Sequence, residues 1–153
     1  MSPRQAVEAV TADIRDHHIT VDGTGLFNAT RHIDLLCHLT ARIAADAEYQ
    51  LAPNIADLPP AKDLGQNVSH LGQAIAHYAQ ALAPLITLTT TAQGTLQQKL
   101  DSLDQHSRLR VHLDGAGRAL ASASTALEVP RPPAASSPPV PAPLRAPAAR
   151  RRT

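Results

Sequence analysis

An apolar pattern with a seven-residue repeat runs through residues 62–85, KDLGQNVSHLGQAIAHYAQALAPL. Its larger apolar residues are spaced alternately four and three positions apart: Leu64, Val68, Leu71, Ile75, Tyr78, Leu82 and Leu85. A mean period of about 3.5 residues is typical of a helix that packs lengthwise against other helices. Smaller residues repeat this spacing near the end of the segment 62–128: Leu113, Gly117, Leu120, Ser124 and Leu127. Because an isolated apolar stripe is not stable in water, we expect the preceding chain to cover it.

The amino-acid composition favours a small helical protein. A length of 153 residues suggests one domain, and the aromatic residues are only Phe27, Tyr49 and Tyr78. The core must therefore consist of leucine, isoleucine, valine and alanine, which interlock well in helix bundles. The excess of arginine over lysine, with abundant alanine, threonine and proline, is typical of a GC-rich, actinobacterial type of genome.

Two helices are predicted before the main pattern. Ser2, Pro3 and Gln5 form a helix start with a capping box, and this first helix is expected to end between Arg15 and His18. The second helix has three candidate caps, Thr24, Asn28 and Thr30, and should end near Gln50 because Pro53 disfavours helical geometry in the residue before it.

The third helix is expected to begin near Ala61 or Lys62 and to meet Pro84 within its apolar pattern. Proline removes one helical hydrogen bond and clashes with the preceding turn, so we predict a kink there; the alternative is a break with a fifth helix. Leu96, Leu100 and Leu103 are expected to continue the core stripe. A turn is predicted within residues 101–107, with Ser102, Asp104 or Ser107 as the cap of the last helix, which should end near Leu127. Asp101 and Asp104 are interpreted as capping residues around this turn rather than as a catalytic pair.

The C-terminal segment differs in charge and composition from the rest of the chain. Residues 1–128 carry a formal net charge of −4 and residues 129–153 one of +5, which together give the +1 of the chain. The C-terminal segment is rich in proline, alanine and arginine, and such a segment cannot bury enough apolar surface to order itself. We therefore predict an all-α fold: an antiparallel bundle over 1–128 with four helices, or five if Pro84 breaks the third, and a disordered tail over 129–153.

The spacing of the titratable residues predicts no catalytic, cofactor or metal site. His70 and His77 lie two helical turns apart, and the other histidines are adjacent or six positions apart, which turns them to different faces. The short-range histidine pairs of helical metal sites are missing, although a histidine and aspartate site assembled between helices stays open. Cys37 is the sole cysteine, which excludes an intramolecular disulfide, and we expect it to be a half-buried structural residue.

These observations favour a non-catalytic helical interaction or accessory protein. Its partner would be a protein that binds the bundle surface, or a second copy that shares the heptad pattern as a coiled coil. The alternative is a nucleic-acid-associated accessory protein, of the type found in mobile elements, that is anchored through Arg145, Arg150, Arg151 and Arg152. No signal peptide or apolar run of membrane-spanning length is evident, so we expect a cytoplasmic protein without a membrane partner.

Overall fold

The computed structural model describes residues 1–51, 58–91 and 94–128, and these residues form four helices and no strand. Helix α1 spans Pro3–Asp16, α2 spans Gly23–Gln50, α3 spans Ala61–Thr90 and α4 spans Leu96–Ala126. The predicted all-α fold is confirmed. The predicted tail, residues 129–153, lies outside the described residues.

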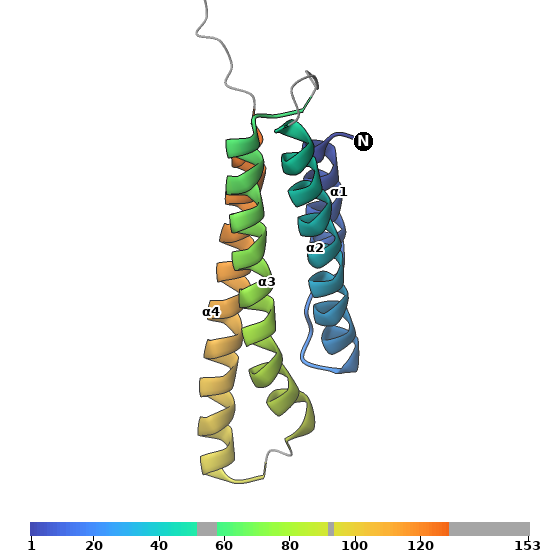
Figure 1. Cartoon of the computed structure of the whole chain (residues 1–153). Coiled ribbons are helices and arrows are strands. Elements are labelled where there is room, and N and C mark those ends of the chain that lie inside the picture. The colour runs from blue at the N-terminus through green and yellow to red at the C-terminus, as the bar shows by residue number, and fades with distance from the viewer. Residues whose placement is uncertain (52–57, 92–93, 129–153) are drawn as a thin grey trace, which may run out of the picture.

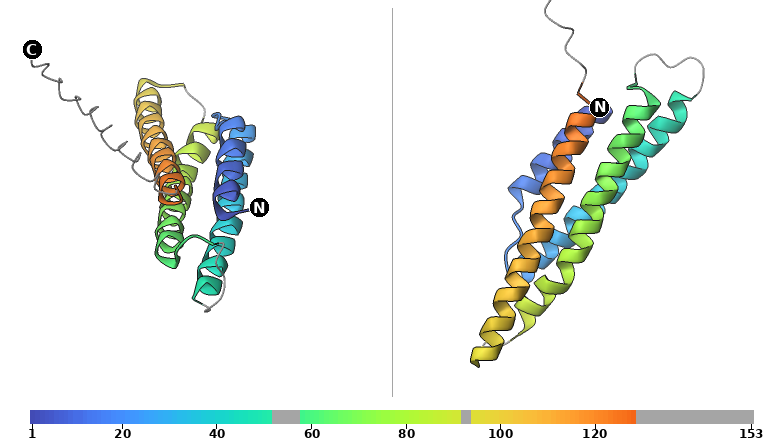
Figure 2. Two further views of the ribbon diagram at one scale, coloured as in Figure 1. Left: turned by 90° about the horizontal axis from the view of Figure 1, so that it is seen from above. Right: turned by 90° about the vertical axis from the view of Figure 1, so that its left-hand side faces the viewer.

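The helices form an antiparallel bundle in which each helix contacts two others (Figure 1). α2 packs between α1 and α3, α3 packs between α2 and α4, and α1 also contacts α4. α1 has 14 residues whereas α4 has 31, so α1 covers only part of the length of α4. The end of the hairpin made by α3 and α4 therefore projects beyond the connection between α1 and α2 (Figures 1 and 2).

The first two helices have the predicted ends with one exception. The Ser2 hydroxyl accepts a hydrogen bond from the backbone N–H of Gln5, whose side chain accepts one from the N–H of Ser2, so the capping box is confirmed. α2 ends at Gln50 as predicted, but it begins earlier than any of the three candidate caps allows. Its cap is Asp22, whose carboxylate accepts from the N–H of Gly25 and from the Thr20 hydroxyl. Aspartate caps a helix as well as threonine or asparagine does, and here the Thr20 hydroxyl holds its carboxylate in place.

The boundary between the last two helices differs from the prediction. Residues 101–107 are part of α4, because α3 ends at Thr90 and α4 already begins at Leu96. Thr95 and Gln98 form a second capping box, which fixes the start of α4 at Leu96. The reason is local: a run of β-branched threonines ends α3, and Gly94 followed by a strong cap restarts the helix.

α3 runs through Pro84 without a break, so the alternative of a fifth helix made by a break there is wrong. Proline has no backbone N–H, and the carbonyl of Gln80 consequently loses its usual helical donor. Figure 1 shows the axis of α3 bending in its C-terminal part, in the direction away from α4.

The core seam of α3 alternates large and small residues. Leu64, Leu71, Tyr78 and Leu85 are buried as the pattern predicts, whereas Val68, Ile75 and Leu82 are half-buried at its edge. The fully buried positions between the large residues are Asn67, Ala74 and Ala81. On α4, Ala116 and Ala123 are likewise buried in place of the predicted Gly117 and Ser124. Small side chains at these positions let the backbones of α3 and α4 approach closely, and the Asn67 amide donates to the carbonyl of Ala123 across this contact.

Candidate interaction surface

The N-terminal half of α4 exposes a row of leucines. Leu96, Leu100 and Leu103 have exposed fractions of 75%, 52% and 66%, and we call this set the α4 leucine face. Their spacing of four and three places them on one side of the helix, because an α-helix repeats about every 3.6 residues. The sequence predicted these three leucines in the core, and the structure shows that this was wrong.

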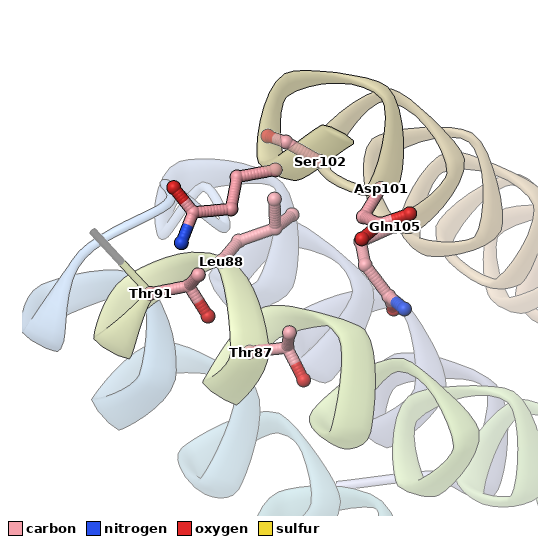
Figure 3. A pocket seen from close by; sticks show the side chains of 7 residues that line it. Thr87, Leu88, Thr91, Asp101, Ser102 and Gln105 are labelled. Atoms are coloured by element: carbon pink, nitrogen blue, oxygen red, sulfur yellow. The ribbon is translucent and has the colours of Figure 1, made fainter. Parts of the chain in front are cut away.

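The opposite side of the same helical turns is polar. Gln98, Ser102 and Gln105 face α3 and line a cavity of about 340 Å³ together with Thr87, Leu88, Thr91 and Asp101 (Figure 3). The usual amphipathic arrangement is thus reversed at this end of α4, since the larger apolar side chains point to solvent and the amides point to the neighbouring helix. The bundle does not use the α4 leucine face for its own packing.

The capping box at Thr95 positions the leucine face. It fixes Leu96 as the first helical residue, and the Gln98 side chain also accepts a hydrogen bond from the N–H of Gly94. The flanking charges are partly paired within the helix: the Arg108 guanidinium lies 2.9 Å from the Asp104 carboxylate. Asp101 and Asp104 were predicted as caps of a turn, but they lie inside α4, where Asp101 accepts a hydrogen bond from Gln97.

The cavity between α3 and α4 offers hydrogen-bonding groups rather than a reactive pair. Its lining is amides, hydroxyls, one leucine and the Asp101 carboxylate. The Thr87 hydroxyl donates to the carbonyl of Ala83 in its own helix. No histidine, cysteine or cation stands beside Asp101 among the residues that line the cavity.

Two histidines that are distant in sequence meet between α3 and α4. The ring centroids of His77 and His112 are 6.1 Å apart, and the ring of His77 lies against Gly115. The sequence did not indicate this pair, because spacing within one helix cannot show which histidines face each other across two helices. Within the described parts of the chain, no group of three histidine, cysteine, aspartate or glutamate side chains is arranged to hold a metal ion.

His32 is the most deeply buried histidine. It is 1% exposed, and its ring meets the edge of Tyr78 at a centroid distance of 5.3 Å. Neither ring nitrogen has a hydrogen-bond partner among the described residues. Burial lowers the pKa of His32 and raises the pKa of Tyr78 to about 12, since a buried site disfavours the charged form of each group.

Other candidate residues lie at the surface. His17 and His38 contact Asp13 and Asp34 four positions before them, as their spacing suggests. Cys37 was predicted to be half-buried, but it is exposed, because α2 turns Leu36 rather than its neighbour toward the core. Arg145, Arg150, Arg151 and Arg152 lie outside the described residues.

Across 1–51, 58–91 and 94–128, no helix combines the length and the apolar character needed to cross a lipid bilayer. No protein-family model, curated protein or solved structure matches this chain. Functional inference therefore starts from the surface itself.

Proposed function

We propose that this chain is a non-catalytic helical interaction protein that binds another protein chain through the α4 leucine face. The observation that carries the proposal is the exposure of Leu96, Leu100 and Leu103 on one side of a capped helix. Single exposed leucines are common on protein surfaces, whereas a row at helical spacing supplies the anchors that helix recognition uses.

The packing of α4 supports this interpretation. The leucines on the outer side of α4 add nothing to the bundle core, because the turns that carry them face α3 with Gln98, Ser102 and Gln105. Exposing apolar area to water costs roughly 25 cal/mol per Å², so a partner that covers the leucines lowers the free energy of the complex. A partner helix laid along α4 would remove these leucines from water without displacing any contact of the bundle.

Site-specific photo-cross-linking tests the proposal. A benzoylphenylalanine at position 103 is expected to form discrete protein adducts in cells that produce the chain, and mass spectrometry would identify them. The control places the same group at position 51, since Leu51 is 78% exposed and lies at the other end of the bundle. The absence of any adduct at position 103, or the same adducts at both positions, would contradict the proposal.

A second candidate function is association with nucleic acid. Its support is the separation of charge, because residues 129–153 carry a formal charge of +5 with no acidic residue. Arg145, Arg150, Arg151 and Arg152 would contact phosphates without reading sequence, whereas the net acidic bundle would contribute little.

A further inference from the structure

We infer that the partner of the α4 leucine face is a second copy of this chain, and that the two α4 helices pack side by side in parallel. The inference rests on the proposed function, because it names the partner of the same surface. It is carried by the order of apolar and charged residues along the first three turns of α4.

The leucine face has the register of a two-stranded coiled coil. Leu96 and Leu103 occupy d positions, Leu100 occupies an a position, and Ser107 is the next a residue. In a parallel pair of identical helices each of these layers meets its own copy across the two-fold axis. Three leucine layers would then be stacked along the axis, and each would cover side chains that a single copy leaves more than half exposed.

The flanking charges are complementary in the parallel arrangement. Lys99 is at a g position and Asp104 is at the e position of the following heptad. In parallel coiled coils these two positions are neighbours across the interface. The two-fold axis therefore places Lys99 beside Asp104 of the opposite copy at two places, where the lysine joins the ion pair that Asp104 makes with Arg108 in its own helix. In an antiparallel pair g residues face g residues, which would bring Lys99 and His106 of both copies to the same edge. Charge complementarity therefore selects the parallel orientation.

The shape of the bundle leaves room for this pairing. The hairpin end of α3 and α4 projects beyond α1 and α2 (Figure 1), and the leucine face is on the side of α4 opposite to α3. The apolar seam ends after Leu103, because the next a and d positions hold the exposed residues Ser107 and Arg110. So short a seam buries less than the ~1,200 Å² at the lower limit of standard interfaces, and we expect a weak dimer with a Kd on the order of 100 μM.

Sedimentation equilibrium of the full chain measures this association directly. Between about 10 μM and 1 mM the chain is expected to pass from monomer to dimer, in keeping with that affinity. Leu103→Asp should keep it monomeric, and the matched control Leu51→Asp should leave the dimer unchanged. Both leucines are exposed, so circular dichroism should show both variants folded.

Charge reversal tests the ion pairs. Lys99→Glu alone and Asp104→Lys alone should each weaken the dimer by roughly tenfold, since each change creates like-charge contacts at two symmetric places. The double variant restores opposite charges and should recover most of the lost affinity. A merely additive loss in the double variant would contradict the assigned register.

Cysteine cross-linking tests the orientation. In a Cys37→Ser background, Leu96→Cys places one thiol at the start of the seam. Parallel helices bring the two thiols together, so oxidation with copper phenanthroline should form a disulfide-linked dimer. Antiparallel helices separate the two positions by more than the ~7 Å between Cα atoms that a disulfide can bridge.

The outcomes separate this inference from the proposed function. A chain that stays monomeric at 1 mM overturns self-association, yet heterologous adducts at position 103 would still support a docking surface. A dimer that persists in Leu103→Asp places the contact on another face and overturns the inference. A dimer that is lost in Leu103→Asp but does not cross-link through position 96 overturns the parallel arrangement.

Discussion

At the scale of single residues, two glycines of α4 differ in the space that is available for a side chain. A Cβ on Gly117 would meet nothing within 4 Å, whereas a Cβ on Gly115 would lie 2.5 to 2.8 Å from ring atoms of His77. Gly115 therefore makes room for the His77 ring between α3 and α4. Gly117 has no such neighbour and only lowers the helix propensity of α4.

Alanine at the two positions should have opposite effects. Gly117→Ala should raise the free energy of unfolding by about 0.5–1 kcal/mol, because alanine restricts the unfolded chain and fits the helix. Gly115→Ala should show no such gain, because the ring of His77 must move. Urea denaturation measures both free energies. In a His77→Ala background the ring is absent, so Gly115→Ala should then raise the free energy of unfolding relative to His77→Ala alone. Equal gains in the two single variants would show that Gly115 does not position the ring.

His32 predicts a loss of stability in acid. Burial is the main cause of its lowered pKa; the Asp13 carboxylate and the backbone of His17 act against burial, while the charges of the His17 ring and of Arg31 act with it. The unfolded chain, with a histidine pKa of about 6.5, takes up a proton as the pH falls below that value, whereas the folded chain takes it up only at a lower pH. The stability contributed by neutral His32 is therefore complete above about pH 6.5 and is lost below it, at up to ~1.4 kcal/mol per pH unit.

A leucine at position 32 isolates this effect. His32→Leu has no ring nitrogens to desolvate, so it should be at least as stable as the parent chain at pH 7. Between pH 6.5 and pH 5 its melting temperature should fall less steeply, while the seven other histidines remain as an internal control. Parallel melting curves for the two proteins across this range would exclude His32 as the acid-sensitive group.

At the scale of helices, small residues set the distance between α3 and α4. Ala74 on α3 is 0% exposed, as is Ala116 on α4, and both belong to the same buried cluster. Ala74→Leu should lower the free energy of unfolding by about 1–3 kcal/mol, because extra methyl groups in a packed core force neighbouring side chains and backbone apart. The matched control is Ala79→Leu on the exposed side of α3, which should change stability by less than ~0.5 kcal/mol. Thermal or urea unfolding of the two variants compares them, and equal stabilities would mean that α3 and α4 can separate without cost.

The helices themselves were predictable from the sequence where a short-range signal was strong. The capping box at Ser2, the end of α2 before Pro53 and the start of α3 after Pro60 are all encoded within a few residues. The start of α4 has an equally local signal in Thr95 and Gln98. The leucines that follow have the spacing of a continued core stripe, however, and this spacing alone predicts the turn at residues 101–107.

The leucine face could not be predicted for a different reason. Leu96, Leu100 and Leu103 have the spacing of core residues, and spacing alone does not say whether the covering helix belongs to the same chain. That depends on how α4 is rotated about its own axis, which turns Gln98, Ser102 and Gln105 toward α3 and the leucines away from it. The meeting of His77 and His112 is of the same kind, since the relative rotation of two helices is set by the whole bundle.

At the scale of the whole molecule, the chain separates an acidic bundle from a basic segment, and this predicts salt-sensitive binding to polyanions. Residues 1–128 have a formal charge of −4, so the bundle repels phosphates, while residues 129–153 have one of +5. Each phosphate contact releases counterions and contributes about −0.7 to −0.9 to the slope of log K against log salt. If the second candidate function holds, the full chain is expected to bind heparin and single-stranded DNA at low salt.

Arg150, Arg151 and Arg152 should account for most of that slope. Changing all three to alanine is expected to reduce its magnitude by about two to three, since three phosphate contacts are lost. Changing all three to lysine keeps the charge, and because phosphate attraction without sequence reading needs charge rather than the guanidinium fork, binding should be nearly unchanged. Fluorescence anisotropy at several salt concentrations measures the slope for each protein. A full chain that shows no affinity even at low salt would exclude nucleic acid as a partner of the basic segment and leave protein binding through the α4 leucine face as the remaining proposal.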